Sequence, residues 1–364
     1  MSHEPIAQRK LRVGVVGLGW AGGRHLAGYA ALPDVEIAAL AGLEEDKLQE
    51  LGSKYDIPHL YSDYQDLVAR DDLDIVSVCT PNHLHAPITI AALEQGKHVL
   101  CEKPLARDAS EAEAMVKAAV DGDKVLHVAF NHRQRGDVQV LRRFLDQDQL
   151  GRIYHVKATW MRRSGIPGMG SWFTSRHMAG GGPLIDLGVH VLDLALYLLG
   201  EPEVRSVSAA TYAELGPRGR GFSGTKRMSV GSAYEVEDLA TAFIRLGDGS
   251  TVNLEASWAV YGGANDDFGV TLYGTSGGAE IKVREYRWQD TLRIYTDAAG
   301  VPAVLSPEVQ QGEGHIAVVR NFVAAVRAEQ VDHAPALAGL RRVRIIDACY
   351  RSAVEGRELP VVHD

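Results

Sequence analysis

Short apolar runs alternate with stretches of helical periodicity over the first third of the chain. Runs rich in β-branched residues predict strands at 11–16, 35–41, 75–79, 98–101 and 125–130. Helical stretches lie between them, as at 22–32 and 87–95. Strands that alternate with helices of about ten residues form βαβ units, so this part predicts an α/β domain with a parallel sheet.

After residue 150 the apolar runs become longer and partly alternate with polar positions. These runs predict strands at 153–160, 204–212, 239–245, 251–260 and 269–273. Alternation of this kind is typical of an antiparallel sheet with one face on a core. The remaining pattern predicts a helix within 180–199, a long loop at 216–231, and closing helices near 315–327 and 337–354.

Composition narrows the class of protein. The chain has 364 residues, of which 46% are hydrophobic, and a net charge of −9. This length allows two globular domains, and the acidic balance argues against nucleic acid as a partner. The polar N-terminus and the absence of an apolar run of roughly 20 residues predict a cytoplasmic protein with no membrane partner.

Cysteine and histidine spacing gives no metal motif. Cys79, Cys101 and Cys349 contain no CxxC pair, so we expect neither a disulfide framework nor a structural zinc site. His83 and His85 lie close together in sequence, but no third ligand is evident beside them. We therefore expect no metal in the site.

A glycine-rich loop follows the first predicted strand. Gly17, Gly19 and Gly22 form a GxGxxG motif, with Trp20 and Ala21 between the last two glycines. The first glycine permits a tight turn, the second lets a pyrophosphate approach the backbone, and the third lets helix and strand pack closely. The N–H groups at the start of the following helix favour phosphate. This context predicts a dinucleotide site.

The end of the second predicted strand bears on the choice of dinucleotide. An acidic residue there normally binds the ribose hydroxyls of NAD, but Gly42 stands at the expected position and Glu44 lies slightly further on. No arginine lies nearby to bind a 2′-phosphate. The sequence favours NAD and leaves NADP open.

Three further motifs follow in order. They are Thr80-Pro81-Asn82-His83-Leu84-His85, Glu102-Lys103-Pro104, and the segment from Gly180 through Asp186 and Gly188 to His190. With the glycine loop, they resemble the Gfo/Idh/MocA family of sugar and cyclitol dehydrogenases, with an inositol-dehydrogenase-like histidine at 190. The resemblance covers nearly the whole chain, including Val236-Glu237-Asp238.

The resemblance implies a fold. It is an α/β protein with an N-terminal Rossmann domain built on a parallel sheet, followed by an α/β domain with a large, mostly antiparallel open sheet. A nicotinamide cofactor would bind in the cleft between the two. We expect a flexible tail over 1–10, a dinucleotide-binding domain over 11–130, and a substrate-binding and oligomerisation α+β domain over 131–364. The closing helices would be free to pack back on the first domain.

The resemblance also implies functional residues. Lys103, Asp186 and His190 would form the catalytic cluster and also contact substrate, Glu102 would lie near the nicotinamide ribose, and Thr80, Pro81 and Asn82 would lie along the cofactor. Sequence position adds further candidates, which are His85 and Trp172 for cofactor and Asn131, Arg133 and Arg163 for a sugar or polyol substrate. The expected reaction is hydride transfer between NAD(P) and a secondary hydroxyl or ketone of a sugar, glycoside or cyclitol.

The chemistry at this cluster requires a base. Asp186 and His190 are four apart, so they would share one helix face. Histidine has an unperturbed pKa near about 6.5, which suits proton transfer at neutral pH. We favour His190 as acid/base, oriented by Asp186. Lys103 would bind the reacting oxygen and the cofactor ribose and relay the proton, and we keep the opposite division between Lys103 and His190 open. A helix-terminal Asp186 and a core His190 are the structural alternatives.

Two other functions stay open. One is transient redox with retained NAD, which would give net hydrolysis, elimination or epimerisation of a glycoside. The other is a non-catalytic dinucleotide sensor. In each case, an open antiparallel sheet can leave a face that needs cover, so we expect a homodimer or homotetramer.

Overall fold

The computed structural model describes residues 9–168, 170–222, 234–328 and 330–362. Most of the predicted tail (1–8) and the later part of the predicted loop (223–231) lie outside the described residues. Contacts divide the chain into two compact units. The first comprises Met1–Asn131 with Glu313–Leu340, and the second comprises His132–Gly312 with Arg341–Asp364.

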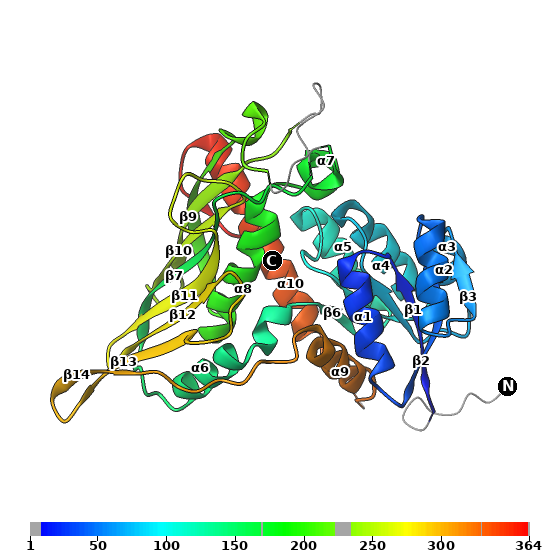
Figure 1. Ribbon diagram of the computed structural model, residues 1–364, viewed down its shortest axis with the longest axis horizontal. Helices are drawn as coiled ribbons and strands as arrows, with labels where there is room; N and C mark the ends of the chain where they lie inside the picture. The colour runs from blue at the N-terminus through cyan, green and yellow to red at the C-terminus, as the bar shows by residue number, and fades with distance from the viewer. Residues whose placement is uncertain (1–8, 169, 223–233, 329, 363–364) are drawn as a thin grey trace. The chain divides into compact units, whose positions relative to one another are not determined.

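The first unit is built on a six-stranded parallel sheet, at the blue end of the colour range in Figure 1. Its strand order is β3-β2-β1-β4-β5-β6. Its strands are β1 (Leu11–Val16), β2 (Val35–Ala41), β3 (His59–Tyr61), β4 (Ile75–Val78), β5 (His98–Cys101) and β6 (Leu126–Val128). The strand order reverses between β1 and β4, and doubly wound sheets bind ligands outside the carboxyl ends of strands at such a point. The parallel sheet expected from sequence is confirmed, with β3 as an addition.

Helices connect these strands and pack on the sheet. They are α1 (Trp20–Ala30), α2 (Glu45–Lys54), α3 (Tyr64–Val68), the 3₁₀ turn η1 (Asn82–Leu84), α4 (His85–Glu94), α5 (Ala109–Asp121) and the late helix α9 (His315–Val326). A Cβ at Gly28 would lie 2.8 Å from Val319 Cγ2, so α1 and α9 pack closely. Val319 and Phe322 join the core that contains β1. The segment 313–340 therefore belongs to this unit although it follows the second in sequence.

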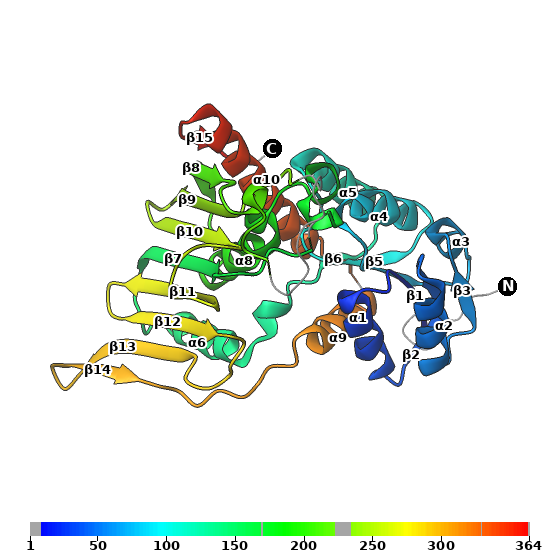
Figure 2. The ribbon, with the colours of Figure 1, turned by 45° about the horizontal axis from the view of Figure 1, so that its top comes forward.

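The second unit is built on a nine-stranded sheet in the order β14-β13-β12-β11-β7-β10-β9-β8-β15 (Figure 2). Its strands are β7 (Ile153–Arg162), β8 (Val204–Tyr212), β9 (Leu239–Leu246), β10 (Thr251–Ser257), β11 (Asp266–Gly274), β12 (Gly278–Arg284), β13 (Leu292–Ala298), β14 (Val301–Leu305) and β15 (Leu359–Pro360). Neighbours are antiparallel except for β7 and β10. The predicted mostly antiparallel open sheet is confirmed.

One face of this sheet is covered by the buried helix α8 (Val189–Leu198), which contacts β7, β10 and β11. The other elements of the unit are η2 (Asn131–Gln134), α6 (Gly136–Asp146), η3 (Trp172–Thr174), α7 (Arg176–Ala179), the π-helix η4 (Leu184–Gly188), η5 (Gly216–Arg218) and part of α10 (Ala334–Glu355). Alternation along β7 and β10 buries one side of each strand, as Val156 and Leu254 show. The opposite side carries Lys157 and Glu255.

Among the described residues, one helical segment, Arg176–Leu198, has the length and composition of a membrane span. However, 89% of its apolar window is buried inside the protein. Its hydrophobic side chains therefore form part of the core of the second unit.

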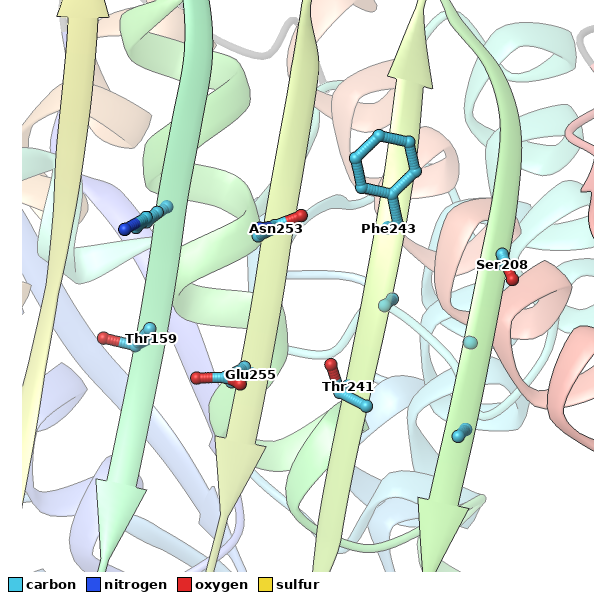
Figure 3. Close-up of a pocket in the computed structure, with 10 residues that line it drawn as sticks. Thr159, Ser208, Thr241, Phe243, Asn253 and Glu255 are labelled. Carbon is cyan, nitrogen blue, oxygen red and sulfur yellow. The ribbon is translucent and has the colours of Figure 1, made fainter.

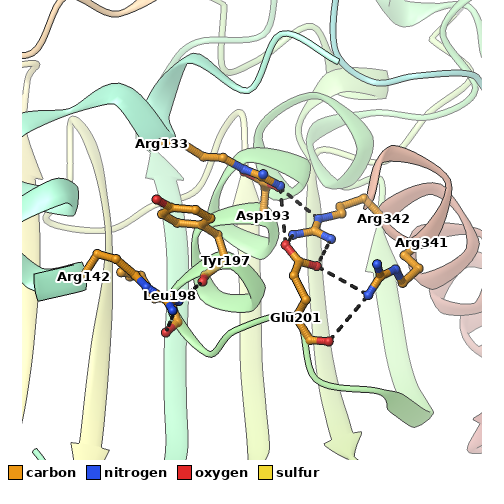
Figure 4. Close-up of polar contacts among 8 residues, drawn as sticks. All are labelled: Arg133, Arg142, Asp193, Tyr197, Leu198, Glu201, Arg341 and Arg342. Atoms are coloured by element: carbon orange, nitrogen blue, oxygen red, sulfur yellow. Dashed lines mark hydrogen bonds and ion pairs between the residues drawn. The ribbon is translucent and has the colours of Figure 1, made fainter. Parts of the chain in front are cut away.

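A buried ionic network ties α8 to α10 within the second unit (Figure 4). Asp193 Oδ1 lies 2.9 Å from Arg342 Nε, and Asp193 Oδ2 lies 2.8 Å from Arg133 Nε. Arg342 also donates to Glu201 Oε1 at 2.6 Å, while its own side chain is fully buried. Because each buried charge has an opposite charge within hydrogen-bond distance, the network avoids an uncompensated ion in the core.

Candidate active site

The glycine loop has the shape that a pyrophosphate needs. Gly17 has φ +108°, and a Cβ there would lie 2.3 Å from the carbonyl oxygen of Cys79. A Cβ at Gly22 would lie 2.0 Å from the carbonyl oxygen of Gly17, so helix and loop are in close contact. A Cβ at Gly19 would meet nothing within 4 Å. The first and third glycines therefore pack the turn, and the second leaves open space above it.

The start of α1 faces this open space. Gly19 is its N-cap residue and offers no side-chain cap to the helix N–H groups, which suits an anion. Trp20 follows and is 66% exposed, with Arg24 over its ring at 5.1 Å and His315 against it at 5.2 Å. The loop and the uncapped helix fit the dinucleotide that the glycine motif predicts.

Gly42 lies at the end of β2 beside the side chain of Leu18. A Cβ at Gly42 would lie 2.3 Å from Leu18 Cγ, and Leu18 is only 3% exposed. This contact explains why no acidic side chain occupies the position. Glu44 is the N-cap residue of α2 and is exposed, and Glu45 and Asp46 follow in the first turn.

The loops after β4 and β5 carry the next predicted residues. Asn82 is buried in η1, and His85 at the start of α4 is 1% exposed. The His85 Nδ1 lies 2.8 Å from the carbonyl oxygen of Pro104, and its Nε2 lies 2.9 Å from that of Thr80. Burial lowers the pKa of this imidazole. His85 therefore connects the Thr80 loop to the Glu102-Lys103-Pro104 loop, and its contact with cofactor stays a prediction.

Glu102 lies between two histidines that sequence analysis did not identify as partners. Its Oε1 is 3.1 Å from His25 Nε2 and 3.3 Å from His315 Nε2. Its Oε2 accepts a hydrogen bond from the Lys103 backbone N–H at 3.1 Å. The ligand atoms of this trio lie within 4.8 Å of one another, so among the described residues it is a group that could hold a metal ion. No sequence motif links residues so far apart in the chain.

Asp186 and His190 lie in the second unit, as parts of successive helical segments. Asp186 lies in the π-helix η4, which ends at Gly188. Helix α8, which carries His190, begins at the next residue, Val189. This differs from the regular α-helical face that we expected. A Cβ at Gly188 would lie 3.3 Å from Ala256 Cβ and 3.2 Å from Leu184 Cδ1, which shows how closely this turn approaches β10. Single π-turns within helices are frequent at functional sites.

Two neighbours position Asp186 and the turn before it. The indole Nε1 of Trp258 donates to Asp186 Oδ2 at 2.9 Å. Glu237 accepts from the backbone N–H groups of Gly182 at 3.0 Å and Leu184 at 3.1 Å, and from the Tyr350 hydroxyl at 2.8 Å. Burial raises the pKa of Glu237 despite these donors. The Glu237 carboxylate thus anchors the glycine-rich turn that carries Asp186.

His190 lies among aromatic rings. It is 8% exposed, and its ring centroid is 4.6 Å from that of His132 and 5.4 Å from that of Trp160. Phe268 stacks on Trp160 with centroids 4.4 Å apart. Tyr286 completes the set at 5.8 Å from Phe268. We refer to His132, Trp160, His190, Phe268 and Tyr286 as the aromatic cluster.

Arg162 brings a charge to this cluster. Its Nε donates to Asp266 Oδ2 at 3.0 Å and its NH2 donates to the Tyr286 hydroxyl at 3.0 Å. The Trp160 indole N–H donates to the other oxygen of Asp266 at 2.8 Å. Burial alone would lower the pKa of Arg162, but Tyr286, Asp266 and Asp186 together raise it. The guanidinium is therefore charged, and Asp266 balances it.

Arg163, and not Arg162, is the residue predicted from the sequence. Arg163 lies just beyond β7 and is exposed, and its NH1 donates to the carbonyl oxygen of Gly262 at 3.1 Å. The period-two alternation of β7 could have identified Arg162, because it places Arg162 on the side of Trp160.

The other predicted residues have local partners. Arg133 is bound to Asp193 in the ionic network and contacts the Tyr197 ring at 5.0 Å. Trp172 stacks on Phe173 with centroids 3.8 Å apart. Asn131 begins η2, a short way beyond the end of β6 at Val128. Their roles toward substrate or cofactor stay predictions.

The first unit has a parallel sheet with a dinucleotide loop, and the second carries His190 and the hydrogen-bonded Asp186. Together these features define a two-domain NAD-dependent oxidoreductase. Residues 11–130 match the family described as "Oxidoreductase family, NAD-binding Rossmann fold", and residues 138–280 match the GFO/IDH/MocA C-terminal domain. The chain belongs to the Gfo/Idh/MocA family, as the motifs predicted. The expected family, cofactor class and enzyme class are confirmed.

Individual relatives are similar over most of their length. D-glucoside 3-dehydrogenase of Escherichia coli (strain K12) is 33% identical over 348 residues, which are 95% of this chain and 96% of that protein. Levoglucosan dehydrogenase of Pseudarthrobacter phenanthrenivorans is 32% identical over 301 residues, covering 79% and 76%. A solved structure of levoglucosan dehydrogenase in complex with NADH has a TM-score of 0.84 at 27% identity, covering 98% of this chain and 100% of that one.

Proposed function

We propose that the protein transfers a hydride between NAD and a secondary ring hydroxyl of a glucoside or a closely related neutral sugar. The observation that carries this proposal is the cluster around His190, where an acid/base group, a positioned Asp186 and stacked aromatic rings occur in one unit. The names of the two relatives, a glucoside dehydrogenase and a levoglucosan dehydrogenase, support the same substrate class.

Each residue has a distinct proposed role. His190 takes the proton from the substrate hydroxyl in oxidation and returns it in reduction. Asp186, which accepts a hydrogen bond from Trp258, provides the negative charge that stabilises the protonated imidazole of His190. Lys103 donates a hydrogen bond to the reacting oxygen and to the cofactor ribose, and relays the proton. The nicotinamide, when bound, accepts or donates the hydride.

The aromatic cluster suits a sugar ring. Trp160 and Phe268 are only 3% and 2% exposed and stack on one another, so they support the cluster from within the core. The ring of Tyr286, which is 49% exposed, offers apolar area for C–H groups, while Arg162 and the Tyr286 hydroxyl offer hydrogen bonds for sugar hydroxyls. Because Asp266 forms an ion pair with Arg162, this arginine leaves no net positive charge in the cluster to attract an anionic group. A neutral glycoside therefore fits it better than a sugar phosphate.

We propose NAD rather than NADP as the preferred cofactor. Glu44, Glu45 and Asp46 place negative charge at the start of α2, close to the end of β2 where the adenosine ribose binds in this fold. A 2′-phosphate would be repelled there. Lys47 is the only basic residue in the segment 42–47, and it lies beyond all three acids.

We also propose a homo-oligomer formed through the face of the second sheet opposite α8. Figure 3 shows Thr159, Asn253, Thr241 and other side chains projecting from one face of neighbouring strands. They line a shallow hollow of about 510 Å³ that contains both Lys157 and Glu255. A patch with both signs of charge can complement a second copy of itself across a two-fold axis. Sedimentation of wild type and of Thr241→Arg tests this, because an arginine there would dissociate the assembly.

We propose a cytoplasmic location. Cys79, Cys101 and Cys349 are all buried free thiols. Free thiols without disulfides are typical of a reducing compartment. Fractionation of the native host with an antibody against the protein tests the location directly.

The function is tested with purified protein and a panel of sugars. Alkyl glucosides, levoglucosan, cyclitols and sugar phosphates are offered with NAD or NADP, and absorbance of the reduced cofactor is followed. We expect reduction of NAD with neutral glucosides, in step with formation of the keto product. Product without net NADH would instead establish transient redox. Cofactor binding without turnover on any sugar would establish a sensor.

A further inference from the structure

A buried chain of polar side chains runs through the first unit next to Lys103. The His25 Nδ1 lies 2.7 Å from Ser77 Oγ, and its Nε2 lies 3.1 Å from Glu102 Oε1. The same carboxylate oxygen lies 3.3 Å from His315 Nε2. We refer to His25, Glu102 and His315 as the carboxylate clamp.

Burial makes the charge of the clamp significant. The His25 side chain is fully buried, and Glu102 and His315 are 7% and 8% exposed. Although burial alone would raise it, the hydrogen bonds from His25 and His315 hold the pKa of Glu102 well below its usual range. The Lys103 N–H adds a donor to the second oxygen. The contacts of Glu102 with His25, His315 and the Lys103 N–H all stabilise its ionised form.

The clamp lies at the edge of the sheet where the cofactor binds. Glu102 directly follows β5, and its N–H donates to the carbonyl oxygen of Val78 at the end of β4 at 2.9 Å. His25 lies on α1, the helix that begins in the glycine loop, and His315 contacts Trp20 of the same helix. A dinucleotide with its pyrophosphate at α1 and its adenosine at β2 would extend its other nucleoside toward β4 and β5.

We propose that His25 and His315 are positioning residues that keep Glu102 as a fixed anion, and that this anion makes the site prefer the oxidised, cationic nicotinamide over the reduced, neutral one. The inference rests on the hydride-transfer function proposed above. At an effective dielectric constant of about 20, the attraction between two opposite unit charges several ångströms apart corresponds to a preference of about ten-fold or more for the cationic cofactor over the neutral one. The clamp thus promotes release of reduced cofactor and biases the bound equilibrium toward NAD⁺.

The test is the ratio of two dissociation constants, measured without substrate. Calorimetry gives the Kd of NAD⁺, and nicotinamide fluorescence gives the Kd of NADH. Replacing the charge in Glu102→Gln is expected to lower the ratio of the NADH Kd to the NAD⁺ Kd by about ten-fold. His315→Ala is expected to lower the ratio by about three-fold, since one of two histidine donors is lost. His315→Gln, whose amide N–H can still donate to the carboxylate, is expected to restore the wild-type ratio.

The controls separate this role from a structural one. His25 is fully buried, so the histidine variants are made at His315 instead. His59→Gln on β3 serves as the matched control in the same unit. If both dissociation constants rise together in Glu102→Gln and the ratio stays constant, the proposal is overturned. It is also overturned if metal analysis finds one bound ion per chain that disappears in His315→Ala, because the trio would then be a metal site.

The outcomes also distinguish this inference from the proposed function. If the ratio of the NADH Kd to the NAD⁺ Kd changes in Glu102→Gln but the wild-type protein oxidises no sugar, the role of the clamp is supported and the proposed dehydrogenase function is contradicted. If the wild-type protein oxidises sugar but the Kd ratio is unchanged in Glu102→Gln, only the proposed role of the clamp is contradicted.

Discussion

The side chain of Leu18 fills the space that a Cβ at Gly42 would need, with Leu18 Cγ 2.3 Å from the ideal Cβ position. Leu18 lies in the glycine loop and Gly42 follows β2, so the contact joins two loops that are predicted to bind the cofactor. The missing acid at position 42 is therefore a consequence of packing. The proposed preference for NAD therefore rests on the acidic start of α2.

The first prediction concerns this pair. Gly42→Ala is expected to lower the free energy of unfolding by about 1–3 kcal/mol, because the added methyl group overpacks a buried contact. In a Leu18→Ala background the same substitution is expected to cost close to nothing. Urea denaturation of the four proteins, without cofactor, measures the coupling. Equal costs in both backgrounds would contradict the contact.

The second prediction concerns Gly19, which has open space around it. Gly19→Ala is expected to leave the free energy of unfolding within about 0.5 kcal/mol of wild type. Its methyl group would occupy the space of the pyrophosphate, so we expect NAD affinity to fall at least about ten-fold. Thermal denaturation and calorimetry measure the two effects separately. Unchanged NAD affinity would show that the phosphates bind elsewhere.

The third prediction concerns the acid/base group. His190→Ala and Lys103→Ala are each expected to reduce turnover by about 10²–10⁴-fold while NAD binding is largely retained. Added imidazole is expected to restore part of the rate of His190→Ala, which a purely structural histidine would not allow. Near-normal rates in both variants would contradict the assignment, and His59→Ala serves as the control.

The fourth prediction contrasts neighbouring arginines. Arg162→Met removes hydrogen bonds from a charged donor to Tyr286 and the sugar, so KM for the glucoside is expected to rise about ten- to hundred-fold. KM for NAD should stay unchanged. Arg163→Met, at an exposed position, is expected to have little effect. A larger rise in KM for Arg163→Met than for Arg162→Met would instead support Arg163, the residue predicted from the sequence.

The fifth prediction concerns stability against pH. Burial, helped by Lys124, lowers the pKa of His98 to about 4, and its Nδ1 accepts from the Val125 N–H at 3.0 Å. The folded state therefore binds fewer protons than the unfolded state between the unfolded pKa of about 6.5 and about pH 4, so stability falls as pH falls through this range. The loss is on the order of 3 kcal/mol.

The matched variant is His98→Asn, whose side-chain oxygen can accept the same N–H without taking up a proton. We expect its stability to fall less steeply than that of wild type between pH 6.5 and 4. Parallel curves for the two proteins would show that His98 does not contribute.

The sequence predicted those parts of the protein that depend on local spacing. Strand alternation and the glycines gave the two sheets and the phosphate loop, because each depends on residues close together in the chain. The π-turn at Asp186 was not predicted, since one extra residue in a helical turn leaves no periodic signal over so short a segment. The pairing of Glu102 with His25 and His315 was not predicted either, because tertiary packing alone brings these residues together.

The two outermost strands of the nine-stranded sheet, β14 and β15, each contain a proline, Pro302 and Pro360. Proline has no N–H to donate, so neither border offers an uninterrupted row of donors to an incoming strand. Val301, Val304 and Leu305 on β14 are exposed and would otherwise favour such addition. The sheet is thereby protected from edge-to-edge aggregation, which leaves its broad face as the surface on which it can associate.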